Sequence, residues 1–203
     1  MGVTIHYRGV IDEPERIRDL QRELTDVAKS MGWEYSLLDD DWAVSPDAEL
    51  VHGQSSVTIK GHLGLKGISL LPGGGGEALV FFIDSTGRLR SIMDMIQQCE
   101  GRTIPDRAWV SMKTQFMSPD VHVWIVGLLR YLQKQYFSNL EVDDEGGFWE
   151  TGDRAGLEAK MHFLNEKMDE LATDLNAEAL GDLSGLSAED IASRIEDFLK
   201  ERQ

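Results

Sequence analysis

The sequence predicts an α+β fold in which two β-α-β halves share a mixed or antiparallel sheet, with helices on one face and further helices at the C-terminus. Three observations support this prediction. The order strand, helix, strand occurs in residues 3–42 and again in residues 109–149, and from residue 154 onward the apolar residues follow a helical period. We therefore expect a core domain of residues 1–153 and a C-terminal helical segment, 154–203, packed on it.

The first half begins with GVTIHYRGVI, whose β-branched and aromatic residues predict a strand. A helix is predicted next, because Pro14 suits the first helical position and apolar residues then recur every three or four positions. These residues are Ile17, Leu20, Leu24, Val27 and Met31. Gly32 is placed to end the helix. The strand EYSLL follows and ends in the acidic run 39–41, with Trp42 directly behind it.

The middle of the chain predicts strands joined by turns. Residues 57–65 alternate as one strand, with a bulge or bend at its glycines. ALVFFID is a strand, Ser-Thr-Gly a turn, and DMIQQCEG a short helix. The run PGGGGE at 72–77 is not a phosphate loop, because that loop requires Gly-Lys-Ser/Thr at the start of a helix and Glu77 begins a strand.

The second half repeats the pattern. AWVSMKTQF predicts a strand, and residues 119–137 predict the most buried helix, with Ser118 as its N-cap. The strand NLEV then leads into EVDDEGGFWETGD, residues 141–153. We interpret this stretch as a structural hairpin with an acidic rim, in which Phe148 and Trp149 resume a strand and Asp153 caps the next helix. The acids do not follow the spacing of an EF-hand loop.

The C-terminal segment predicts two helices. Apolar residues step by three or four positions from Leu157 to Leu175, and Ser187 is placed to cap a last helix. Such helices cover their own domain, each other, or a second copy of the chain, so a homo-oligomer through them is one expectation.

The charge is concentrated near the C-terminus. The net charge is −16, and residues 141–203 hold 18 acidic against 6 basic residues. This surface repels nucleic acids and anionic membranes and suits a basic protein partner. No apolar run reaches the length of a membrane span and the opening lacks a secretory signal pattern. Cys99 is the only cysteine, so we expect a cytoplasmic protein without intrachain disulfides.

The candidate site residues are carboxylates at the two acidic strand ends. If the halves are pseudo-symmetric, these ends face one another and could hold a divalent cation; no other cofactor is predicted. The candidate ligands are Asp39, Asp41, Asp143, Asp144, Glu145 and Glu150. The five histidines have no zinc-site spacing.

Three classes of function follow. The charge asymmetry and the lack of catalytic motifs favour a non-catalytic interaction or regulatory protein that uses its acidic C-terminal third, rather than an enzyme. The first alternative is a metal-dependent hydrolase whose site is formed by acidic strand ends 39–41 and 143–145. The second is a small-ligand binding domain in which Trp42, Trp109 and Trp149 line a pocket.

Overall fold

The computed structural model describes residues 3–53, 56–73 and 76–174, and it confirms the α+β class. The chain divides into two compact units, and the features below belong to the first, Met1–Glu158, except for the end of the last helix. The elements in order are β1 (Thr4–Arg8), the 3-10 helix η1 (Pro14–Arg16), α1 (Ile17–Met31), β2 (Glu34–Asp39), β3 (Glu49–His52), β4 (Val57–Lys60), β5 (Lys66–Leu71), β6 (Leu79–Ile83), β7 (Leu89–Arg90), α2 (Ile92–Cys99), β8 (Val110–Lys113), α3 (Pro119–Gln135), β9 (Glu141–Asp144), α4 (Phe148–Thr151) and α5 (Arg154–Asp174).

One sheet has the strand order β8-β1-β9 and is antiparallel throughout. The first strand of the chain is therefore the central strand of this sheet. Its residues Ile5 and Tyr7 are fully buried, whereas His6 between them is partly exposed. This alternation gives the sheet one face in the core and one polar face.

The second sheet has the order β2-β5-β6-β7 and is also antiparallel. Its strand β6 has the sequence LVFFI and is buried on both faces. Phe81 belongs to the main core, while Phe82 packs in a second apolar cluster with Met95 and Ile96 of α2. An apolar run of this kind is typical of a strand covered on both sides.

The two sheets are joined where the chain leaves β1. Val10 forms an antiparallel bridge with Arg88, and the N–H of Ile11 donates to the carbonyl oxygen of Gly87 at 2.8 Å. The strands of the first half belong to different sheets, because β1 pairs with β8 and β9 while β2 pairs with β5. Where one shared sheet was expected, the structure has two bridged antiparallel sheets and a separate pair, β3 with β4.

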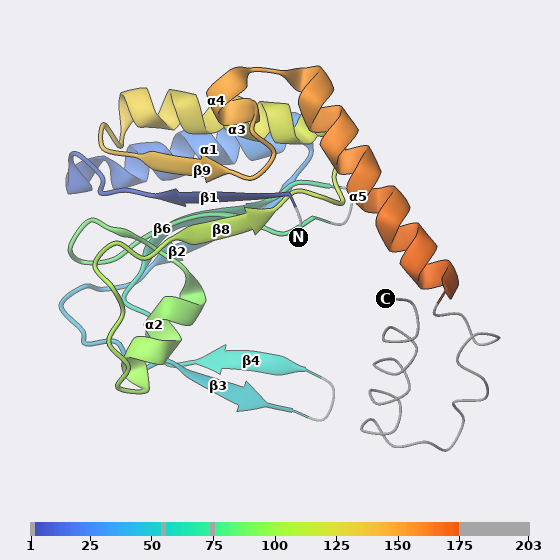
Figure 1. Ribbon diagram of the computed structural model, residues 1–203. Helices are drawn as coiled ribbons and strands as arrows, with labels where there is room; N and C mark the ends of the chain where they lie inside the picture. Colours follow the sequence, from blue (N-terminus) through green and yellow to red (C-terminus); the bar gives the residue numbers. More distant parts are fainter. Residues whose placement is uncertain (1–2, 54–55, 74–75, 175–203) are drawn as a thin grey trace, which may run out of the picture. The chain divides into compact units, whose positions relative to one another are not determined.

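Helices α1 and α3 lie on the same side of the strands and run beside each other (Figure 1). The rings of Trp33, just after α1, and Trp124 in α3 meet edge to face with centroids 4.7 Å apart. The predicted boundary signals are confirmed: Gly32 ends α1 with a φ of 67°, and the Ser118 hydroxyl accepts from the N–H of Val121 at 3.4 Å.

The strand predicted over 57–65 is interrupted. Residues 57–60 form β4 of the β3–β4 hairpin, and β5 begins only at Lys66. Gly61 and Gly64 between them have φ values of 88° and 70°, and the chain bends at Gly61, which is one of the two alternatives expected at these glycines. A Cβ on Gly61 would lie 2.7 Å from the carbonyl oxygen of Asp47.

The strand expected at Phe148 and Trp149 is wrong, because these residues form the short helix α4. Gly147 has a φ of 79°, and the Asp144 carboxylate accepts from the N–H of Trp149 at 2.9 Å. Gly147 in the left-handed conformation reverses the chain, and the Asp144 carboxylate satisfies an N–H group of the first helical turn. This combination starts a helical turn rather than a strand.

The first predicted C-terminal helix is present as α5. Asp153 caps it by accepting from the N–H of Gly156 at 3.0 Å, as expected, and Leu157 is fully buried. The position Leu175 and the helix predicted from Ser187 lie outside the described residues. Among the helices that are described, none has the length and apolar character needed to cross a membrane.

Candidate functional site

The two acidic strand ends do not come together in one site. Asp39 ends β2 in the second sheet, where it pairs with Lys66 at 3.1 Å, whereas Asp143 lies in β9 of the first sheet. Over residues 3–53, 56–73 and 76–166 no three His, Cys, Asp or Glu side chains lie close enough to hold a metal ion.

The carboxylates that follow β2 accept hydrogen bonds from backbone N–H groups of nearby loops. Asp41 accepts from the N–H of Ala43 at 2.9 Å, which is a local turn. Its neighbour Asp40 accepts from the N–H groups of Leu63 and Leu65 at 3.1 and 3.2 Å. Both side chains therefore have structural partners.

Asp144 is buried and structural. Its carboxylate accepts from the N–H of Gly146 at 2.7 Å and of Trp149 at 2.9 Å, and it lies 3.1 Å from His122 Nε2. On the other side of the imidazole, His122 Nδ1 lies 2.8 Å from the Thr114 hydroxyl. Burial alone would raise the pKa of Asp144, but the bond to His122 and the two amide bonds outweigh it, so this pKa is lowered.

The other candidates of this stretch are exposed. Glu145 accepts from the N–H of Thr4 at 2.9 Å and lies 3.9 Å from His6, whose Nδ1 is 2.7 Å from the Ser111 hydroxyl. These residues are neighbours on the open polar face of the first sheet. Asp143 lies on the same face opposite His6, and Glu150 is exposed on α4.

We expect residues 141–153 to bind no divalent cation specifically. Calcium, magnesium and manganese, each in millimolar excess over chelator at constant ionic strength, should shift the melting temperature by similar small amounts, because exposed carboxylates are screened. A specific site at one hundred times its Kd would add about 2.7 kcal/mol, or roughly 5–10 °C. A shift of that size for one ion, removed by Asp143→Asn with Glu145→Gln, would contradict this expectation.

A cavity lies elsewhere in the first unit, and we call it the Asp84 pocket. It has a volume of about 410 Å³ and is lined by residues from the β6–β7 turn, α2, the loop after α2 and the loop after β2. The lining is mixed. Its apolar side chains are Trp42, Val44, Pro46, Met95 and Ile104, and its polar side chains include Ser85, Thr86, Arg88, Arg90, Gln98 and Thr103.

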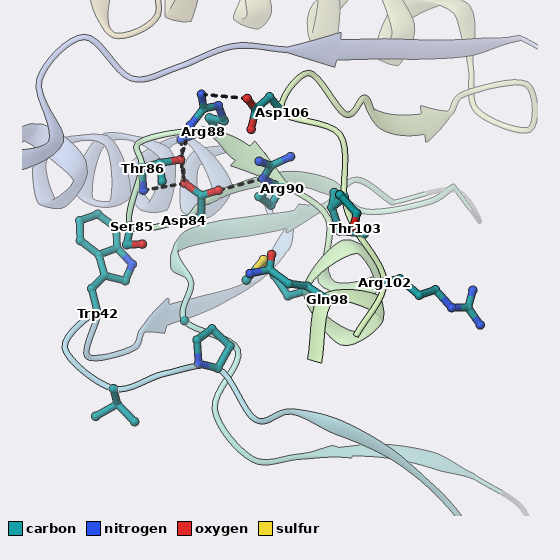
Figure 2. Close-up of a pocket in the computed structure, with 15 residues that line it drawn as sticks. Trp42, Asp84, Ser85, Thr86, Arg88, Arg90, Gln98, Arg102, Thr103 and Asp106 are labelled. Carbon is teal, nitrogen blue, oxygen red and sulfur yellow. Dashed lines mark hydrogen bonds and ion pairs between the residues drawn. The ribbon is translucent and has the colours of Figure 1, made fainter. Parts of the chain in front are cut away.

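Asp84 holds several of the polar side chains of the lining in place (Figure 2). It accepts from the N–H and hydroxyl of Thr86 at 2.8 and 2.6 Å and from Arg90 Nε at 2.8 Å. Arg90 also donates from Nη1 to the carbonyl oxygen of Pro105 at 2.8 Å. Burial alone would raise the pKa of Asp84, but the bonds from Thr86, Arg90 and the backbone lower it overall. Asp84 is thus a fixed anion that orients Arg90.

The remaining groups are less constrained. Arg88 donates to the Thr86 hydroxyl at 2.7 Å and lies 3.8 Å from Asp106. Gln98 reaches from α2 into the space of the pocket, whereas Arg102 points away from it and is exposed at the rim (Figure 2). Uncharged donors and a partly exposed guanidinium facing a cavity can bind an anion without a metal.

Of the three tryptophans expected to line one pocket, only Trp42 lines a described cavity. Its ring also borders a cavity of about 270 Å³ that contains Asp39 and Lys66, and its buried Nε1 has no hydrogen-bond partner in the described part of the chain. Trp109 instead lies under Arg8, with the guanidinium 4.0 Å from its ring centroid. The guanidinium of Arg130 lies 5.4 Å from the ring centroid of Trp149.

Sequence reasoning missed the Asp84 pocket. Its one local signal is the turn sequence DSTGR, in which Asp84 precedes Gly87 and two arginines follow at positions 88 and 90. That pattern indicated only a turn. Comparisons with protein-family models, with curated proteins and with solved structures each find no match to this chain. Its function is therefore inferred from its own residues.

Proposed function

We propose that this protein is a non-catalytic regulatory or interaction protein that binds a small anionic ligand in the Asp84 pocket. The observation that carries the proposal is the placement of Arg88 and Arg90 beside the uncharged side chains of Ser85 and Gln98 in one cavity. Hydrogen bonds from a guanidinium to a carboxylate or phosphate are among the strongest in proteins. In a chain with a net charge of −16, such a cavity is locally attractive to an anion.

The apolar side chains of the lining indicate what else the ligand contains. Trp42, Met95 and Ile104 offer contacts for an apolar or planar group within the same cavity as the arginines. A volume of about 410 Å³ lies within the range of small-molecule sites. A small molecule with one anionic group and one apolar or aromatic part fits this mixed lining.

The lowered pKa of Asp84 supports binding rather than catalysis. Asp84 is held by several hydrogen bonds and its pKa is lowered, which makes it a poor proton acceptor near neutral pH. Among the described residues that line the pocket there is no histidine or cysteine.

The test uses phenylacetate and phenyl phosphate as probes. At one hundred times Kd we expect the melting temperature to rise by roughly 5–10 °C, since binding then adds about 2.7 kcal/mol. Gln98→Glu should abolish the rise, because it places a negative charge in the pocket. Gln97→Glu is the matched control: it makes the same change one residue earlier on α2, outside the lining, and should retain the rise. No rise in the wild type, or the same rise in Gln98→Glu, would overturn the proposal.

The acidic C-terminal third remains the surface proposed for a basic protein partner, and the C-terminal helices for self-association. The excess of acidic residues over 141–203 supports the first of these. Within the described part, Glu141 is engaged by Arg8 and Arg107 and Asp144 is buried. A cytoplasmic location is supported by the single cysteine.

A further inference from the structure

A second cavity adjoins the Asp84 pocket, and we call it the Arg107 pocket. It has a volume of about 280 Å³, and its polar lining includes Arg8, Arg88, Asp106, Arg107 and Glu141. Glu141 accepts from Arg8 Nη2 at 2.7 Å and also from Arg107. This corner of the molecule therefore already accommodates a carboxylate between two guanidinium groups.

The two pockets meet at one ion pair. Arg88 and Asp106 line both of them, and their closest N–O distance is 3.8 Å (Figure 2). The Asp106 side chain is 81% exposed. An exposed pair at this distance contributes little stability, so it is a weak partition between the two cavities.

The combined lining is positive in an acidic protein. It contains five arginines, at positions 8, 88, 90, 102 and 107, against three carboxylates, Asp84, Asp106 and Glu141. Two of the arginines stand at opposite ends and are mostly exposed: Arg102 at 67% and Arg107 at 66%. The Arg107 guanidinium thus has N–H groups that face solvent as well as Glu141.

The loop between these two arginines is held in place. Arg90 donates to the carbonyl oxygen of Pro105 at 2.8 Å, and Arg8 Nη1 donates to that of Arg107 at 3.1 Å. The Arg8 guanidinium is itself stacked 4.0 Å from the Trp109 ring centroid. Side chains that are fixed before binding lower the entropy that a ligand must offset.

We propose that the Asp84 pocket and the Arg107 pocket are two subsites of one groove, which takes an elongated ligand with an anionic group at each end and an uncharged middle. An aliphatic dicarboxylate is the simplest ligand of this class. The middle is uncharged because the two pockets meet at the Arg88–Asp106 ion pair, which has no net charge. This inference rests on the proposed function for its first subsite and adds the second.

The experiment compares one monocarboxylate, hexanoate, with the dicarboxylates succinate, adipate and suberate. Affinity is measured by calorimetry, and the indole N–H signals of Trp42 and Trp109 in NMR spectra report on the two pockets. We expect affinity to rise with dicarboxylate length until both subsites are reached, to about tenfold above hexanoate, the gain of one charge-assisted hydrogen bond. Only the long dicarboxylates should move the Trp109 signal.

Three variants separate the subsites. Arg107→Ala should reduce the affinity for the longest effective dicarboxylate to that for hexanoate and leave the affinity for hexanoate unchanged. Gln98→Glu should lower the affinity for all probes. Arg22→Ala is the matched control, since Arg22 is 70% exposed, pairs with Asp19 and lies outside both pockets. Its binding should equal that of the wild type.

The outcomes distinguish this inference from the function on which it rests. Equal affinities for hexanoate and all dicarboxylates, or a length dependence that Arg107→Ala leaves intact, would overturn the two-subsite groove and leave the first pocket standing. Hexanoate binding that Gln98→Glu does not weaken, or no binding of any probe, would overturn the proposed function and the groove with it.

Discussion

Replacing Asp144 with alanine should lower the free energy of unfolding by about 3–5 kcal/mol, because it strands buried donors and a buried histidine. The groups left without an acceptor are the N–H groups of Gly146 and Trp149, and His122 loses its carboxylate. For a chain of this size the melting temperature should fall by roughly 6–20 °C. Urea denaturation at neutral pH measures the change.

Asp143→Ala is the control, since Asp143 is the exposed neighbour on the same strand and its loss should change stability by less than about 0.5 kcal/mol. Acidification adds a second readout. The pKa of Asp144 is lowered in the folded state, so its contribution is present above the unfolded carboxyl pKa and is lost as the pH falls through the folded value. The difference between wild type and Asp144→Ala should therefore shrink in acid. Equal effects of the two substitutions would contradict the buried network.

Gly67→Ala should be at least as damaging, with a loss of about 3–5 kcal/mol or failure to fold, because there is no room for a Cβ inside the second sheet. Gly67 lies in β5 opposite Phe82 and has a φ of 141°. A Cβ there would approach the carbonyl oxygen of Phe81 to 2.0 Å, which β5 and β6 could relieve only by separating. The Gly67 carbonyl also accepts from Gln21 on α1, so the helix would be disturbed as well.

Gly127→Ala makes the same chemical change but should have the opposite effect on stability. Gly127 is exposed within α3 and a Cβ there meets nothing within 4 Å. The substitution should stabilise the chain by about 0.5–1 kcal/mol through helix propensity. Thermal unfolding of both variants side by side measures the contrast. A tolerated Gly67→Ala would mean that the β5–β6 pairing is looser than described.

The helices of this fold could be predicted because their signals are local. The spacing of Leu20 and Leu24 in α1, and the Ser118 cap of α3, each depend on a few neighbouring residues. The division into two sheets could not be predicted, since it depends on the pairing of β1 with the distant strands β8 and β9, which no short stretch of sequence records.

The burial of Asp144 has a signal in the sequence. Leu140 and Val142 alternate with exposed acids, and the same alternation places Asp144 on the inner face. Its partner His122 is one turn beyond Ser118, on the buried side of α3. The Asp84 pocket had no equivalent signal, because segments around residues 42, 64, 84 and 98 meet only after the chain has folded.

The central place of β1 has a consequence for synthesis of the chain. Strand β1 needs β8 on one side and β9 on the other, and Thr4 binds Glu145, 141 positions later in the sequence. Until residue 145 has emerged, Ile5 and Tyr7 have no complete sheet to join. Pairings at such long sequence separation form slowly and leave apolar strand exposed meanwhile. During synthesis, β1 therefore stays without its two partner strands until both β8 and β9 have been made.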